Sequence, residues 1–195
     1  MDSLVTHSSI LAIAIPLLAA FLTPLISRTG DKARNLLVIA ALAFAEFLVI
    51  ILARDIYLNG VHIYTLGAMS PDLTIPENYM IPIRIILEVD AMSVFMGIIT
   101  TTVSLAAAIY SIPFLKEETG GDRFYTLLLL LTVGMLGLVF TGDMFNFFIF
   151  LEILSISGAA LAAFRTRRAD ATEGGFKYIV ISAVSALVVL FAVGI

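Results

Sequence analysis

Three ionisable side chains lie within long apolar stretches of this sequence: Glu46, Glu152 and Lys177. Glu152 is the most informative, because it lies about nine residues into the stretch 143–164. At a helical rise of about 1.5 Å per residue, its carboxyl group is about 14 Å deep, near the middle of a bilayer core about 30 Å thick. A carboxylate there costs several kcal/mol unless it is protonated, paired or hydrated, and such residues commonly mark paths for protons or cations.

The surroundings of the two glutamates differ. Glu46 lies about eleven residues into the stretch 35–53, and its sequence neighbours are bulky and apolar apart from alanine. A structural interpretation of Glu46 is a protonated carboxyl group that donates to a carbonyl of a neighbouring helix. Ser155, by contrast, shares a helix face with Glu152, and the small residues 157–160 leave room for close packing or water. Glu152 is therefore the predicted ion-binding residue, with Glu46 and Ser155 as further candidates.

Lys177 is predicted to lie a few residues inside the stretch 176–195, near a membrane interface. Two roles stay open: an ordinary lysine that snorkels to water, or a proton relay, since burial lowers a lysine pKa toward the exchangeable range. Its depth differs from that of Glu152 by roughly 13 Å, so only water could connect the two. Asp143, at the outer end of the stretch that carries Glu152, is predicted as a structural N-cap.

The sequence indicates no metal site and no bound cofactor. Cysteine is absent, which excludes thiolate ligands and Cys-ligated iron–sulfur clusters on this chain. The two histidines, His7 and His62, are isolated from each other and from other ligand types in the sequence. No phosphate-binding glycine loop or nucleophile motif occurs. The expected chemistry is ion transfer by side chains, with no catalytic or redox centre.

The elements that position these residues are predicted to be membrane-spanning helices. Of the 195 residues, 61% are hydrophobic and only 13% are charged, whereas soluble domains are about 25% charged. The net charge of −4 argues against nucleic acid as a partner. We expect an all-α integral membrane protein with a single transmembrane domain. Six spans are predicted, at about residues 9–27, 35–53, 90–112, 124–141, 143–164 and 176–195.

The basic residues predict the orientation of these spans. Eight of the eleven Lys and Arg residues fall in the connections after the first, third and fifth spans, namely Arg28, Lys32, Arg34, Lys116, Arg123, Arg165, Arg167 and Arg168. The connection on the opposite side carries only Arg54 and Arg84. Because cytoplasmic connections are enriched in basic residues, both ends of the chain are predicted to be extracytoplasmic.

The long connection between the second and third spans is predicted to hold a short extracytoplasmic β-hairpin within 61–89. Its flanks, 61–67 and 81–89, are rich in β-branched residues, and the stretch between them contains two prolines. We expect the two flanks to pair as antiparallel strands.

The segment 141–164, which begins TGDMFNFFIFLE, resembles a known family when it is taken with Lys177 and Tyr178. This family comprises the antiporter-like proton-translocating subunits of Mrp-type cation/proton antiporters, of respiratory complex I and of membrane-bound energy-converting hydrogenases. The pattern that matches is T-G-D, then spaced phenylalanines and a glutamate, and a K-Y pair early in the next helix.

The resemblance implies a larger fold of about fourteen helices, of which this chain is the amino-terminal portion. It implies that Glu152 and Lys177 take part in proton translocation in a multisubunit membrane complex, respiratory or energy-converting, whose partner subunits carry any oxidoreductase chemistry. The implied setting is a multi-pass protein of the cell membrane, with the bilayer, other membrane subunits and H⁺, or also Na⁺, as partners. The alternative is a truncated or split subunit that conducts nothing and serves as a structural scaffold.

Overall fold

The computed structural model of the chain describes residues 2–66, 85–115, 120–166 and 168–194. Within these ranges it is mostly helical, with six helices and a two-stranded sheet. In chain order the elements are α1 (Asp2–Ile26), α2 (Asp31–Asn59), β1 (His62–Thr65), β2 (Ile86–Val89), α3 (Ala91–Phe114), α4 (Gly121–Phe140), α5 (Met144–Ala162) and α6 (Ala169–Gly194). All six helices are long and apolar enough to cross a membrane, which confirms the predicted number of spans.

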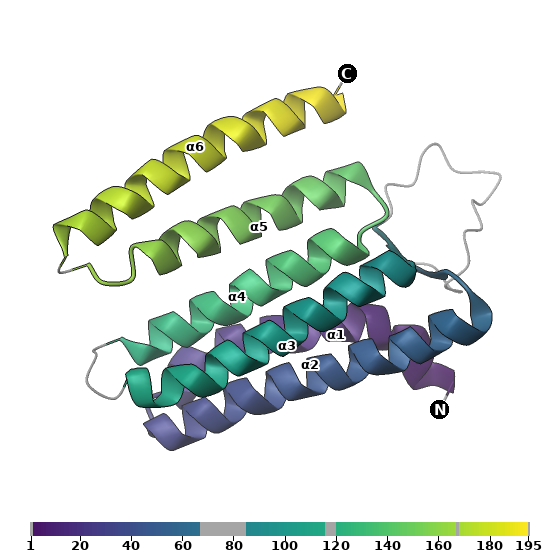
Figure 1. Cartoon of the computed structure of the whole chain (residues 1–195), viewed down its shortest axis with the longest axis horizontal. Coiled ribbons are helices and arrows are strands. Elements are labelled where there is room, and N and C mark those ends of the chain that lie inside the picture. Colours follow the sequence, from purple (N-terminus) through teal and green to yellow (C-terminus); the bar gives the residue numbers. More distant parts are fainter. Residues whose placement is uncertain (1, 67–84, 116–119, 167, 195) are drawn as a thin grey trace.

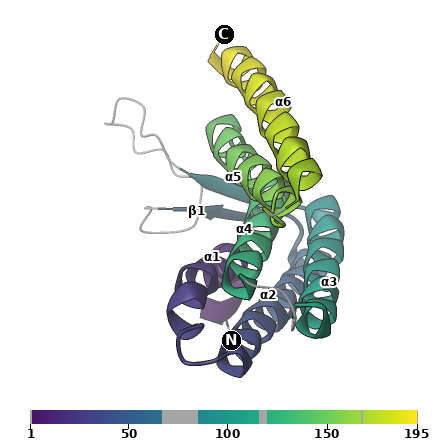
Figure 2. The ribbon, with the colours of Figure 1, turned by 90° about the vertical axis from the view of Figure 1, so that its left-hand side faces the viewer.

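Helices α1 to α4 form a bundle, and α5 and α6 add to one side of it in sequence order (Figure 1). α1 packs against α2 and α4, and α3 also packs against both of these helices. α5 lies against α4, and α6 lies against α5. Figure 2 shows α6 at the edge of the molecule, away from α1 and α2. Helices that are joined by a short connection therefore lie side by side, as is usual for compact chains.

Buried apolar side chains form two clusters inside the bundle. The cluster nearer the sheet contains Leu48 and Leu52 of α2 together with Phe140 of α4. The other cluster contains Leu42 of α2 and Tyr125 of α4. All four helices of the bundle contribute buried residues to both clusters, so the two clusters together hold the bundle as one unit.

The two strands form an antiparallel hairpin at one end of the bundle. His62 pairs with Val89, and Thr65 pairs with Ile86. Residues 67–84 of the predicted hairpin lie outside the described part of the chain. β2 is also tied to the turn between α4 and α5, because the Gly142 amide donates to the Ile86 carbonyl at 2.9 Å. The hairpin therefore holds the beginning of α5 as well as the α2–α3 connection.

Glycines allow α4 and α5 to approach closely. A Cβ atom added to Gly137 would overlap the Phe150 ring, and one added to Gly134 would lie 2.8 Å from the Leu154 backbone nitrogen. Small residues at helix contacts are typical of membrane bundles, in which close van der Waals packing replaces the hydrophobic effect. This contact fixes which face of α5 is turned toward α4.

Candidate functional site

The start of α5 is held by side-chain and backbone hydrogen bonds. The Asn146 amide donates to Asp143 Oδ1 at 2.7 Å, which is the geometry of an N-cap. Asp143 Oδ2 also accepts a longer hydrogen bond, 3.4 Å, from the Ile86 amide of β2. The Asn146 side chain donates to Thr141 Oγ1 at 3.1 Å. The helix that carries Glu152 is thus positioned by its own cap and by the hairpin.

Glu152 lies on the face of α5 that is turned away from α4. Phe150 and Leu154 contact α4, and Glu152 is two residues, about 200° of helix, from each. Ala159 and Ala163 follow at i+7 and i+11, which is the same face as Glu152. Both of these alanines meet α6, because a Cβ atom added to Gly175 would lie 2.5 Å from Ala163 Cβ and 3.1 Å from the Ala159 carbonyl oxygen.

The contacts between α5 and α6 place Glu152 opposite the middle of α6. A Cβ atom added to Gly158 would lie 3.1 Å from the Tyr178 hydroxyl oxygen. This contact sets the antiparallel register of α5 and α6. In that register Glu152 lies level with residues 182–186, and Ala186 is buried there. Glu152 itself is half-buried, and its side chain makes no hydrogen bond or ion pair with the residues that the structure describes.

Lys177 points away from α5. It follows Gly175 by two residues, so it lies on the opposite face of α6, and its side chain is 68% exposed. The register places it level with about residue 159, so it is about 10 Å from Glu152 along the helix. Its ammonium group pairs with Glu173 at 2.5 Å. The structure therefore does not bring Glu152 and Lys177 into direct contact.

The helix that carries Lys177 begins at Ala169, earlier than the predicted span boundary at residue 176. The sequence between them, ADATEGG, is polar, so hydropathy assigns it to a connection although its backbone is helical. Lys177 consequently lies about two turns inside α6. Glu173 was missed by the sequence analysis, although its i,i+4 spacing from Lys177 is the signal that reveals such a pair.

Glu46 has a polar partner that its sequence neighbours do not suggest. Thr102 Oγ1 of α3 donates to Glu46 Oε1 at 2.9 Å. The sequence neighbours of Glu46 are apolar, and its polar partner comes from a different helix, α3. The Glu46 carboxyl group accepts this hydrogen bond from a hydroxyl, whereas the structural interpretation drawn from the sequence has it donate to a carbonyl. Ser155 is half-buried and lies one turn from Glu152.

The two histidines are not isolated in the structure. His62 Nδ1 lies 3.1 Å from Asp55 Oδ2, and His7 Nδ1 lies 2.9 Å from the Tyr64 hydroxyl. Both pairs link the hairpin region to α1 or α2. Among the described residues there is no group of three or more His, Cys, Asp and Glu side chains that could hold a metal ion.

These features define a multi-pass membrane protein. One of its spans carries a carboxyl group near its middle, and this carboxyl group has no partner among the described residues. Two family models match the chain. Residues 75–125 match the amino-terminal domain of chain 5 of NADH-ubiquinone oxidoreductase (complex I), and residues 141–195 match the transmembrane domain of NADH:quinone oxidoreductase and Mrp antiporters. The chain belongs to the family of antiporter-like membrane subunits that these models describe.

Individual relatives agree with this assignment. The chain is 31% identical over 191 residues to NADH-quinone oxidoreductase subunit N of Desulforudis audaxviator, which covers 96% of this chain and 36% of that protein. It is 29% identical over 146 residues to a Na(+)/H(+) antiporter subunit of Alkalihalophilus pseudofirmus, covering 75% of this chain and 27% of that protein.

A solved structure is also similar. It is a chain of the membrane-bound sulfane sulfur reductase, an archaeal respiratory membrane complex, with a TM-score of 0.75 and 26% identity over 91% of this chain and 34% of that chain. The chain thus spans about a quarter to just over a third of the length of these proteins.

Proposed function

We propose that this chain forms part of an ion-translocating, antiporter-like subunit, in which Glu152 takes up and releases the transported proton or sodium ion. The observation that carries the proposal is the position of Glu152, at mid-span on the face of α5 that meets α6. Carboxyl groups at this depth of a membrane are commonly the groups that take up and release transported protons or cations. One charge that crosses 100 mV is worth about 2.3 kcal/mol, comparable with a pKa change of one to two units.

Lys177 is the second group in this proposal. Its ammonium group, paired with Glu173, would exchange protons between Glu152 and the cytoplasmic side. Lys177 lies about 10 Å from Glu152 along the helix and on the face of α6 turned away from α5, so water would have to connect the two groups around α6. Ser155 would donate or accept along this path.

The relatives support a setting in a larger assembly. Their names describe subunits of NADH-quinone oxidoreductase, of a Na(+)/H(+) antiporter and of a respiratory membrane complex. In our proposal this chain contributes the amino-terminal helices of a fold of about fourteen helices in the cell membrane. Other subunits supply the redox chemistry or the remaining ion path. A non-conducting structural role is the alternative that the experiment must separate.

The test is replacement of Glu152 in the full complex. Glu152→Gln keeps the shape of the side chain but cannot titrate, so ion translocation should fall to a small fraction of wild type while the complex assembles normally. Glu152→Asp should keep partial activity, because the carboxyl group survives but is shorter. The matched control is Glu46→Gln, which still accepts a hydrogen bond from Thr102 and should retain most activity. The measurement is cation-dependent proton movement in inverted vesicles, and wild-type transport by Glu152→Gln would leave only the structural role.

Orientation can be tested separately because the chain has no native cysteine. We propose that both ends of the chain are extracytoplasmic, on the strength of the asymmetry in Lys and Arg residues. A cysteine at Asn59, just before the hairpin, should react with an impermeant thiol reagent from outside. A cysteine at Thr166, between α5 and α6, should react only after permeabilisation. The reverse pattern would invert the proposed direction of the path.

A further inference from the structure

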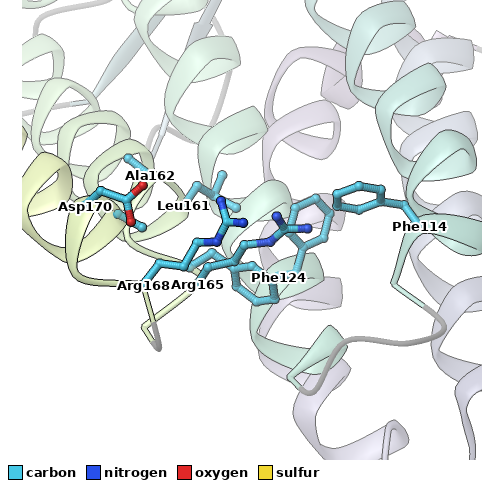
Figure 3. Close-up of a pocket in the computed structure, with 9 residues that line it drawn as sticks. Phe114, Phe124, Leu161, Ala162, Arg165, Arg168 and Asp170 are labelled. Carbon is cyan, nitrogen blue, oxygen red and sulfur yellow. The ribbon is translucent and has the colours of Figure 1, made fainter.

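A cavity of about 380 Å³ opens where α3 and α5 end and where α4 and α6 begin. Its lining includes Phe114 and Phe124, Leu161 of α5, and the polar residues Arg165, Arg168 and Asp170 (Figure 3). The volume is within the range of sites for small molecules, roughly 300–1,000 Å³. The cavity lies at the opposite end of the bundle from the hairpin and apart from Glu152.

The polar part of this cavity is suited to an anion with several oxygen atoms. Figure 3 shows the side chains of Arg165 and Arg168 extending in the same direction into the lining, with the Arg168 guanidinium beside Leu161 and the Arg165 guanidinium turned toward Phe124 and Phe114. The Arg165 guanidinium also lies 5.2 Å from the centre of the Phe114 ring, a cation–π contact that fixes its position. Guanidinium groups bind phosphate through paired N–H donors, and an arginine held in place loses less entropy when it does so. Asp170, on the α6 side, leaves the described lining with a net positive charge.

The apolar part of the cavity indicates the source of that anion. Phe114, Phe124 and Leu161 form walls at the last or first turn of spanning helices, where the hydrocarbon region of a bilayer begins. A free phosphate ion would gain nothing from these walls. A phospholipid would gain from both parts, with its phosphate at the arginines and its acyl chains along the rings and Leu161. Basic pockets between membrane helices are a known mode of binding for anionic headgroups.

We propose that this cavity binds the headgroup phosphate of an anionic phospholipid in the adjacent leaflet. The lipid would bridge the ends of α3 and α5 to the start of α6. It would therefore stabilise the position of α6, whose apolar surface is mostly exposed. This inference does not depend on the proposed role of Glu152.

The experiment measures lipid binding to the protein in its purified complex. Phosphatidylglycerol, phosphatidylcholine and inorganic phosphate are added separately, with thermal unfolding and native mass spectrometry as readouts. We expect phosphatidylglycerol to raise the unfolding temperature and remain bound, and the other two to do neither. Equal effects of phosphatidylcholine would overturn the proposal, and equal effects of inorganic phosphate would show a free-anion site instead.

Variants localise the binding. Arg165→Gln with Arg168→Gln should weaken phosphatidylglycerol binding by about fivefold per arginine. Arg168→Lys, which keeps the charge but loses the planar pair of donors, should have a smaller effect. The control is Arg28→Gln at an exposed arginine of the α1–α2 connection, which removes one positive charge outside the cavity and is compared with the loss per arginine. An equal loss of phosphatidylglycerol binding in Arg28→Gln would show that the arginines act only through general surface charge. If the double variant does not assemble, the wild-type comparison of the three additives decides alone.

Discussion

The bundle α1–α4 and the pair α5–α6 differ sharply in how much of each helix is buried within the chain. Half of the apolar span of α4 is buried, against 17% for α5 and 6% for α6. The largest fully buried side chains, such as Tyr125, Phe140 and Leu52, belong to α2, α4 and β2. The bundle is therefore a packed unit, whereas α5 packs mainly against α4, and α6 packs mainly against α5.

The two intramembrane glutamates follow the same division. Glu46, in the bundle, accepts a hydrogen bond from Thr102, while Glu152, on α5, has no partner among the described residues. The hydrogen bond from Thr102 holds the Glu46 carboxyl group in one position, and the described residues impose no such restraint on Glu152. Packing that holds Glu46 in place would hinder the binding and release of an ion. The looser pair of helices is thus the part of the molecule in which chemistry is expected.

The largest expected effect contrasts one leucine from each region. Leu52 is fully buried in the bundle, and Leu52→Ala should destabilise the protein by about 2–5 kcal/mol through the cavity that it leaves. Leu187 of α6 is 65% exposed, and Leu187→Ala should change stability by less than about 0.5 kcal/mol. Thermal unfolding of the isolated chain in detergent measures both. A large loss from Leu187→Ala in that assay would show that α6 is packed against protein, and the contrast between the regions would fail.

A second prediction uses two adjacent glycines of α6. A Cβ atom on Gly175 would lie 2.5 Å from Ala163 Cβ, so Gly175→Ala should push α6 from α5 and cost about 1–3 kcal/mol. Gly174 has no atom within 4 Å of such a Cβ, so Gly174→Ala should be neutral or stabilising, since alanine favours helix.

The measurement for these two variants is a pair of cysteines on α5 and α6, crosslinked at matched depths. Crosslinking should fall in Gly175→Ala and stay at the level of the parent in Gly174→Ala. Equal crosslinking in both variants would mean that the α5–α6 contact is too loose to be sensitive to one methyl group.

The sequence was sufficient for the number of spans, because each apolar stretch has the length that a bilayer demands. The antiparallel pairing of the hairpin could also be predicted from the sequence, since β-branched residues flank a turn-rich segment. Hydropathy could not locate the start of α6. It measures transfer into lipid, whereas the helix continues through polar residues beyond the membrane.

The partners of the ionisable residues were harder to predict from the sequence. Thr102 lies 56 residues from Glu46, and Asp55 lies seven residues from His62 across the end of α2, so both pairs depend on how elements pack. The side of α6 on which Lys177 lies could be judged only after Gly175 was seen against α5. Sequence spacing fixes faces within one helix, but it does not say which face meets a neighbour.

The smallest predicted effect compares the N-caps of α3, in the bundle, and α5, in the pair. Asp90 accepts from the Ser93 amide at 2.7 Å, and Asp143 accepts from the Asn146 amide at the same distance. Replacement of either aspartate by alanine should cost about 1 kcal/mol. Asp143→Ala should cost somewhat more, because it also loses the hydrogen bond from Ile86.

The N-cap of α3 also leads to a prediction about how the stability of the protein depends on pH. The hydrogen bond from the Ser93 backbone amide holds the pKa of Asp90 below its ordinary value of 3.8. The folded protein therefore keeps this carboxylate charged at a lower pH than the unfolded chain does. The resulting stabilisation is fully present above pH 3.8 and is lost as the pH falls through the lowered pKa of the folded state. In Asp90→Asn the cap cannot titrate, so the stability difference from wild type should shrink on acidification. Thermal unfolding of both proteins from neutral pH to below 3.8 measures this, and a difference that stays constant would show that Asp90 contributes no charge-dependent capping.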